Sequence, residues 1–182
     1  LIENPAGRVL GEAGIDRSRH CIGFLFALNA KQLTQPFGDH DLIVVDHGSS
    51  DKTPEIAAET GATVIDFRGG TIGSARNRGV QECTGTLLVF VDADVSLTPE
   101  WANAFPKTWR SLQESSCQVT GSRCLPEARN DFLTRFWFSR LPQSKARYVN
   151  SGHLITSSTL FETLNGFDDS RHTAEDHDFC MR

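Results

Sequence analysis

Apolar positions gather in short runs along the chain, separated by polar, glycine-rich stretches. Three of these runs, at 41–46, 62–67 and 86–91, are rich in β-branched residues, which is typical of buried strands. A segment with helical features follows each run. Strands that alternate with helices through short loops indicate a parallel sheet covered on both faces. The pattern therefore predicts an α/β fold with a mostly parallel sheet and helices on both of its faces.

Two of the expected helices begin with the same signal. Thr53-Pro54-Glu55 and Thr98-Pro99-Glu100 each combine a capping hydroxyl, a proline in the first helical position and an acid in the first turn. The first helix should end near Gly61, and a further helix is expected over 72–83. Apolar residues near helical spacing also predict a helix over 19–33.

The rest of the chain alternates less regularly. Strands are expected over 117–122 and 151–157, with a short helix over 158–164. Residues 1–18 are glycine-rich and weakly patterned, and they stay unassigned. Because no stretch has the composition of a linker, residues 19–182 are expected to form a single domain.

Composition narrows the class of protein. The 182 residues include 18 Lys and Arg against 23 Asp and Glu, which gives a net charge of −5, and the pI is 5.6. Such a chain has no global attraction for nucleic acid or for an anionic membrane. No apolar run is long enough to cross a membrane, and the first residues lack the order of a signal peptide.

Cysteine usage indicates the compartment. The chain has five cysteines, an odd number, and no pair has the spacing of a zinc site or a redox motif. We therefore expect reduced thiols in a cytoplasmic protein. These cysteines are Cys21, Cys83, Cys117, Cys124 and Cys180.

Carboxylates follow two of the expected strands. Asp46 ends one strand and precedes the loop 48–51, and the pair Asp92 and Asp94 follows the most apolar strand. Ligands of such sheets bind at the carboxyl ends of the strands. Two carboxylates offer hard oxygen ligands to Mg²⁺ or Mn²⁺, which would neutralise phosphate oxygens. Ordinary turn chemistry is the alternative at both places.

Two further groups could carry chemistry. Arg76 lies in an expected helix and could neutralise a diphosphate, although a solvated helix face is the alternative. Glu175 and Asp176 lie in an acidic, histidine-containing segment where an acid or base is plausible. The alternative is a capping box in which Thr173 and Asp176 start the last helix. A zinc site that uses His172 and His177 lacks any standard spacing.

Four segments taken in order resemble the family 2 glycosyltransferases, which have the nucleotide-sugar-binding GT-A fold. The segments are LIVVDHGSSDKT at 42–53, ARNRG at 75–79, LLVFVDADVSLTPEW at 87–101 and LNGFDDSRHTAEDHDFCMR at 164–182. The resemblance covers roughly residues 19–182. It implies a GT-A domain over 19–182 that lacks the C-terminal elements into which relatives continue.

The resemblance implies a donor site for a nucleotide-sugar, with UDP the expected nucleotide. Asp46 would contact the base, with Ser49 and Asp51 of the same loop among the donor-binding residues. Arg76 would lie near the base and the diphosphate, and Asp92 near the ribose or the sugar. The ligand of the divalent metal, Mn²⁺ or Mg²⁺, would be Asp94.

The resemblance also implies the reaction. Asp176 would be the general base that deprotonates a hydroxyl of the acceptor, and the anomeric centre would invert in one in-line displacement. The chain departs from the family at His47, where a second Asp or Asn is usual, and in residues 1–20, where the family's first strand is not recognisable. A nucleotide-sugar-binding pseudoenzyme is therefore an alternative. A phosphatase of the haloacid dehalogenase type is another, because VFVDADVS at 89–96 is similar to its signature.

The segment 132–148 is expected to shape the acceptor site. Its four basic residues fit a saccharide or a lipid-linked glycan, and they also fit peripheral contact with the inner face of the membrane. An amphipathic helix with solvated basic residues is the simpler alternative. The basic residues are Arg135, Arg140, Lys145 and Arg147.

Overall fold

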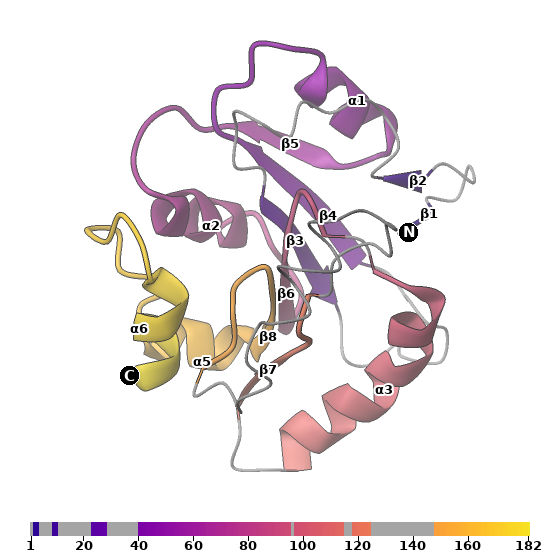
Figure 1. Ribbon diagram of the computed structural model, residues 1–182, viewed down its shortest axis with the longest axis vertical. Coiled ribbons are helices and arrows are strands. Elements are labelled where there is room, and N and C mark those ends of the chain that lie inside the picture. The colour runs from indigo at the N-terminus through magenta and orange to yellow at the C-terminus, as the bar shows by residue number, and fades with distance from the viewer. Residues whose placement is uncertain are drawn as a thin grey trace, which may run out of the picture.

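A six-stranded sheet forms the centre of the molecule (Figure 1). The computed structural model describes residues 2–3, 9–10, 23–28, 40–95, 97–114, 118–124 and 148–182. The strand order is β5-β4-β3-β6-β8-β7, and a separate antiparallel pair joins β1 to β2. The strands are β1 (Ile2–Glu3), β2 (Val9–Leu10), β3 (Gly23–Leu28), β4 (His40–Asp46), β5 (Thr63–Asp66), β6 (Leu87–Asp92), β7 (Val119–Gly121) and β8 (His153–Ser157).

Helices cover both faces of this sheet, as the sequence predicts. They are α1 (Thr53–Glu59), α2 (Ile72–Val80), α3 (Pro99–Glu114), α5 (Ser158–Thr163) and α6 (Glu175–Met181). Figure 1 shows α3 on one side of the sheet, with α2, α5 and α6 gathered on the other. The α/β class expected from the sequence is thus the architecture observed.

The sheet is mixed, which corrects the expected mostly parallel arrangement. Strands β4, β5, β6 and β7 point the same way, whereas β3 and β8 run opposite to their neighbours. Among the described strands, the pairing of β4 with β5 is parallel and the other pairings within this sheet are antiparallel. The apolar runs predicted the positions of strands in the sequence. An apolar run does not, however, encode the direction of its strand within the sheet.

The helix expected over 19–33 is also wrong. Residues 23–28 form β3, which lies between β4 and β6 and pairs with both along its whole length. Its sequence GFLFAL is almost uniformly apolar. A short apolar run of this kind fits a central strand as well as one side of a helix, so periodicity alone could not decide.

Strand β6 divides the apolar core into two halves because its successive side chains point to opposite faces. Leu87, Val89 and Val91 pack with residues of α1 and α3, including Ala57, Phe105 and Trp109. Leu88 and Phe90 pack on the other face with residues of α2, α5 and α6, among them Ala75, Phe161 and Phe179. A strand buried on both sides explains why the run 87–91 contains no polar residue.

The predicted helix starts are confirmed in one case and shifted in the other. The hydroxyl oxygen of Thr98 accepts a hydrogen bond from Trp101 N at 3.2 Å and caps α3. Thr53 lies inside α1 rather than capping it, and its N–H donates to the Asp51 carboxylate over 2.9 Å. The N-cap of α1 is Lys52, and no side chain caps this helix.

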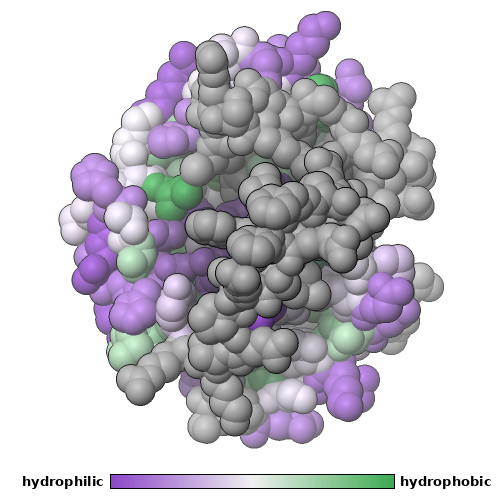
Figure 2. Space-filling view, in the orientation of Figure 1, coloured by the Kyte–Doolittle hydropathy of each residue, from purple (hydrophilic) through white to green (hydrophobic). Residues whose placement is uncertain are grey.

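Among the described residues, the large apolar side chains that are exposed are those of Tyr148 and Met181. Figure 2 shows one face on which the described residues are mostly hydrophilic, with small separate apolar spots. Across the described part of the chain, no helix has the length and hydropathy to cross a membrane. Most of the predicted acceptor segment 132–148, together with Cys21 and Cys117, lies outside the described residues. Of the described cysteines, Cys83 is partly buried and Cys124 is exposed, and both are free thiols.

Candidate active site

Two carboxylates lie at the same edge of the sheet. Asp46 ends β4 and Asp92 ends β6, and these two strands point the same way on either side of β3. Gly23, the first residue of β3, pairs with Val45 on one side and with Asp92 on the other. The strand order therefore brings together the two strand ends that the sequence singled out.

Asp46 is held within its own turn. Its side chain is buried, and the carboxylate accepts hydrogen bonds from Ser49 N, at 3.1 Å to Oδ2, and from the Ser49 hydroxyl. Gly48, with a φ of 88°, gives the turn its left-handed bend. His47 Nε2 bonds to Gly69 O at 2.9 Å, and its ring stacks on Phe67. This turn is thereby tied to the glycine loop that precedes α2.

The segment Asp92-Ala93-Asp94 forms a tight turn at the end of β6. Val95 N donates to Asp92 O over 3.0 Å, and the Asp94 side chain is exposed to solvent. Burial together with the negative charges of Asp92 and Asp94 raises the pKa of the Cys124 thiol. Cys124 therefore lies beside the carboxylate pair, a position that its isolated place in the sequence gave no means to predict.

Arg76 reaches this edge from α2. Its side chain is 5% exposed, and its two terminal nitrogens bond to different carboxylates: Nη1 to Glu175 Oε1 at 2.6 Å and Nη2 to Asp92 Oδ1 at 2.7 Å. The guanidinium also lies 5.8 Å from the centre of the Phe167 ring. A charge-assisted pair of this kind gives strong directional bonding. Arg76 thus faces the interior and not solvent, which removes the solvated-helix interpretation.

Glu175 and Asp176 begin α6, and both side chains are buried. Ser151 N donates to Asp176 Oδ2 over 3.0 Å, and the Ser151 hydroxyl donates to Glu175 Oε1 over 3.2 Å. The alternative interpretation, a capping box with Thr173, is wrong, because the N-cap is Ala174 and no side chain caps this helix. Ala174 has a φ of 60°, and this left-handed residue sets where α6 begins.

These contacts join three of the seven predicted site residues in one polar network, while Asp46 and Ser49 bond to each other within their own turn. The network runs from Asp92 through Arg76 and Glu175 to Ser151 and Asp176. Asp51 lies apart from it at the start of α1. Ser151 was missed by the sequence analysis, which assigned the stretch 151–157 only to a strand. The sequence offered one hint of a functional role for Ser151, which is that a serine followed by a glycine stands at the start of that expected strand.

The turn at Asp92 and Asp94 fits a divalent metal by its chemistry. Both residues supply carboxylate oxygens, and Asp92 Oδ2 is not the oxygen that Arg76 holds. A Cβ at Gly152 would come within 3.2 Å of Asp92 Oδ2, so the missing side chain keeps that oxygen accessible. Mg²⁺ is typically held by one or two carboxylates, with phosphates and waters as its other ligands. Within the described residues no group of three or more His, Cys, Asp or Glu could hold a metal, which leaves the zinc interpretation without support.

His153 lies behind the site in β8. Its ring is 2% exposed, Nδ1 accepts from Ser122 N at 2.7 Å, and Trp101 meets the ring edge-on. Nε2 has no hydrogen-bond partner among the described residues. Burial lowers the pKa of His153 to about 4, so the imidazole is neutral at pH 7.

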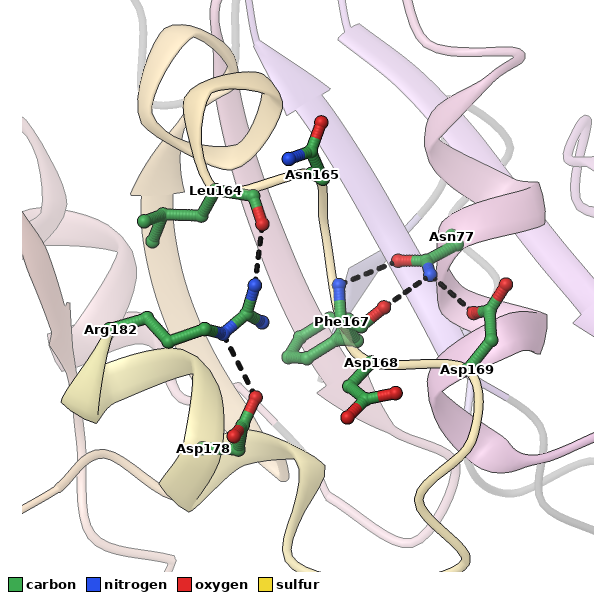
Figure 3. A pocket seen from close by; sticks show the side chains of 8 residues that line it. All are labelled: Asn77, Leu164, Asn165, Phe167, Asp168, Asp169, Asp178 and Arg182. Atoms are coloured by element: carbon green, nitrogen blue, oxygen red, sulfur yellow. Dashed lines mark hydrogen bonds and ion pairs between the residues drawn. The ribbon is translucent and has the colours of Figure 1, made fainter.

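A pocket of about 370 Å³ opens between α2, the loop 164–169 and α6 (Figure 3). The Asn77 side chain lines it, accepts from Phe167 N at 2.9 Å, and donates to Phe167 O and to Asp169 Oδ1. Arg182 bonds to Asp178 and to the Leu164 carbonyl. These contacts hold the loop that leads to α6 in place. The side chains that line the pocket therefore have a structural role, and they lie next to the polar network.

Comparison with known proteins supports a common ancestry. The model of the family "Glycosyl transferase family 2" matches residues 21–162. A pre-mycofactocin glycosyltransferase of Mycobacterium tuberculosis is 28% identical over 122 residues, which are 60% of this chain and 25% of that protein. A PGL/p-HBAD biosynthesis glycosyltransferase of Mycobacterium bovis is 44% identical over 69 residues, covering 35% of this chain and 27% of that protein. The chain thus spans about a quarter of the length of these curated relatives.

The fold has a counterpart among solved structures. The crystal structure of S. aureus TarS 1-349 superposes with a TM-score of 0.54 at 20% sequence identity, and the match covers 84% of this chain and 48% of that one. At this level of identity the likeness concerns the fold. The family model covers well over half of the chain and includes the Asp46 turn, Arg76 and the Asp92 turn. The chain therefore belongs to glycosyl transferase family 2.

Proposed function

We propose that the protein transfers a sugar from a nucleotide-sugar, with UDP as the nucleotide, to a hydroxyl group of an acceptor with inversion at the anomeric carbon. The observation that carries the proposal is the network that connects Asp92, at the end of β6, to Asp176, at the start of α6. Donor-side and acceptor-side carboxylates of such a transfer must be held in a fixed relation.

The donor side is assigned to the two strand ends. Asp46 and Ser49 would contact the base and ribose, with Asp51 at the rim of the same loop, and Asp92 would lie at the ribose or sugar. Asp94, which is exposed at the turn, would be the main protein ligand of Mn²⁺ or Mg²⁺. Bound there, a divalent metal would supply charge stabilisation for the departing diphosphate.

Arg76 acts on the donor site by holding Asp92. Both of its terminal nitrogens bond to carboxylates, so the guanidinium that fixes Asp92 would add positive charge behind the diphosphate. This role differs from the direct contact with diphosphate suggested by the resemblance, and it needs no movement of the buried side chain.

Asp176 is assigned as the general base. A carboxylate in this role takes the proton of the acceptor hydroxyl as the new glycosidic bond forms, while the bond from the anomeric carbon to the diphosphate oxygen breaks. The hydrogen bond from Ser151 N orients Oδ2. A saccharide or lipid-linked glycan is the proposed acceptor, and contact with a membrane surface is part of the same proposal.

A binding and turnover experiment tests this assignment. UDP-glucose, UDP-N-acetylglucosamine and UDP-galactose are each added with and without Mn²⁺, and thermal stability and release of UDP are measured. The proposal expects stabilisation that requires Mn²⁺, and slow release of UDP by transfer to water. Stabilisation without any release, even when saccharide acceptors are supplied, would favour a nucleotide-sugar-binding pseudoenzyme. The family match gives no support to the phosphatase alternative.

A further inference from the structure

One oxygen atom of Glu175 joins two parts of the site. Oε1 accepts from Arg76 Nη1 at 2.6 Å and from the Ser151 hydroxyl at 3.2 Å. We propose that Glu175 is a positioning residue that sets the spacing between the donor-side carboxylate of Asp92 and the base carboxylate of Asp176. The inference rests on the proposed function, because it assigns Glu175 a role within that reaction.

The first arm of this connection runs through Arg76 to Asp92. The guanidinium is planar and rigid, so its two terminal nitrogens hold their carboxylates at a fixed separation. Arg76 is 5% exposed and the Glu175 side chain 8%, whereas the Asp92 side chain is 37% exposed and faces the site. The pair of Arg76 and Glu175 is thus fixed in the interior, while the Asp92 carboxylate that Arg76 holds is accessible to solvent.

The second arm runs through Ser151 to Asp176. The Ser151 hydroxyl lies within bonding distance of Glu175 Oε1 and is 3.5 Å from Asp176 Oδ2, while its N–H donates to the same Oδ2. The next residue closes a ring, because Asp92 N donates to Gly152 O over 3.1 Å. Asp92 is therefore linked to the Ser151–Gly152 segment both directly and through Arg76 and Glu175.

This geometry assigns Glu175 a different task from Asp176. Glu175 is the buried partner of a permanently charged guanidinium, and the oxygen that it uses already accepts two hydrogen bonds. A carboxylate in that position is poorly placed to take a proton from an acceptor. Its contacts instead fix two groups that would face the substrates.

The test compares Glu175→Gln, which keeps Oε1 as an acceptor, with Glu175→Ala, which removes it. Glu162→Ala, at an exposed position of α5, is the control. The measurements are kcat and KM for hydrolysis of the UDP-sugar that the wild type turns over fastest, the Kd of UDP with Mn²⁺, and the melting temperature. We expect kcat of Glu175→Ala to fall about 10²-fold, because a misplaced group can cost that much. Glu175→Gln should stay within about fivefold of wild type, and the Kd of UDP within about threefold in both variants.

Three results would overturn the proposal. A Gln variant as inactive as the Ala variant would make Glu175 an acid or base in its own right. Wild-type kcat in Glu175→Ala would leave it without a role in the reaction. Equal losses in Kd and kcat would make it a donor-binding residue.

A measurement without ligand separates this inference from the proposed function. Asp92→Asn and Asp176→Asn are combined in a double-mutant cycle on the urea-unfolding equilibrium, in the wild-type and in the Glu175→Ala background. We expect a coupling of at least about threefold in the unfolding constant that disappears without Glu175. Additive effects in the wild-type background would refute the positioning role. If the wild type binds no UDP with Mn²⁺ and hydrolyses no UDP-sugar, the proposed function fails, while this cycle still decides whether Glu175 connects the two carboxylates.

Discussion

Arg76 donates a hydrogen bond to Glu175 over 2.6 Å, although 99 positions separate these two residues in the sequence. Both side chains are more than nine-tenths buried. A pair of opposite charges in the interior is costly to break from one side, because the remaining charge is left without a partner. This ion pair therefore connects the start of α6 to α2, and replacing either residue should destabilise the fold whatever its effect on activity.

Removing Arg76 should reveal this cost. Arg76→Ala leaves Glu175 buried without its cation, and we expect a loss of about 3 kcal/mol in the free energy of unfolding. Arg78→Ala on the same helix is the control: its partly exposed pair with Glu82 should be worth less than about 1 kcal/mol. Urea denaturation of both variants measures the difference. Equal stability of the two variants would contradict the buried pair.

The metal assignment makes a prediction for Asp94. With Mn²⁺ present and UDP at about 100 times its Kd, the wild type should gain about 2.7 kcal/mol in stability. Asp94→Ala should lose the part of this gain that depends on Mn²⁺, since the exposed carboxylate would no longer hold the ion. Asp66→Ala, an exposed aspartate at the end of β5, should behave as wild type. Undiminished Mn²⁺-dependent binding in Asp94→Ala would place the metal elsewhere.

The proton transfer makes a prediction for Asp176. Asp176→Asn keeps the shape of the side chain and still accepts from Ser151 N, but it cannot take a proton from a hydroxyl. Transfer should fall by about 10²–10⁴-fold while UDP–Mn²⁺ affinity changes no more than a few-fold. Steady-state kinetics and calorimetry on the same preparation separate the two effects. Normal turnover in this variant would rule out Asp176 as the base.

His153 should make stability depend on pH. Its pKa is lowered by burial from 6.5 to about 4, so the unfolded chain binds this proton at a higher pH than the folded protein does. The stabilising effect is fully present above pH 6.5 and is lost as pH falls towards 4, by about 3 kcal/mol in all. Urea unfolding between pH 5 and 7 should show stability that rises with pH.

The control for that experiment removes the titrating ring. In His153→Gln the free energy of unfolding should change less between pH 5 and 7. Most carboxylates are already ionised in that range, so they contribute little to the slope. His172→Gln, at an exposed position, should leave the wild-type slope unchanged. An identical slope in His153→Gln would show that other groups cause the pH dependence.

The sequence predicted the local parts of this molecule well. Strands that end at Asp46 and Asp92 are visible because long apolar runs stop abruptly at a carboxylate, and Thr98 signals the start of α3 by its chemistry. The direction of β3 and β8 was not predictable, because packing of the whole sheet and not the local pattern decides it. For the same reason, the sequence pattern predicted a helix where the protein forms β3.

The site shows the same division. Arg76, Asp92 and Asp176 could each be chosen from their neighbours in the sequence, but the bonds that connect them could not. Thr173 fitted the pattern of a capping box, yet the left-handed backbone at Ala174 starts the helix one residue later. Ser151 gave almost no signal, since its importance lies in which atoms of distant residues it meets.

The two-sided burial of β6 has a consequence for how the protein loses activity. A slip of one residue in this strand would turn Leu88 and Phe90 towards α3 and move Leu87 and Val89 to the opposite face, exchanging both halves of the core. A shift of Asp92 by one residue along the sheet requires that exchange, and a shift by two residues requires every pairing of β6 with β3 and β8 to re-form in a new register. Inactivation by heat or denaturant should therefore coincide with cooperative melting of the sheet, without an earlier stage in which the fold persists and its catalytic edge has drifted out of alignment.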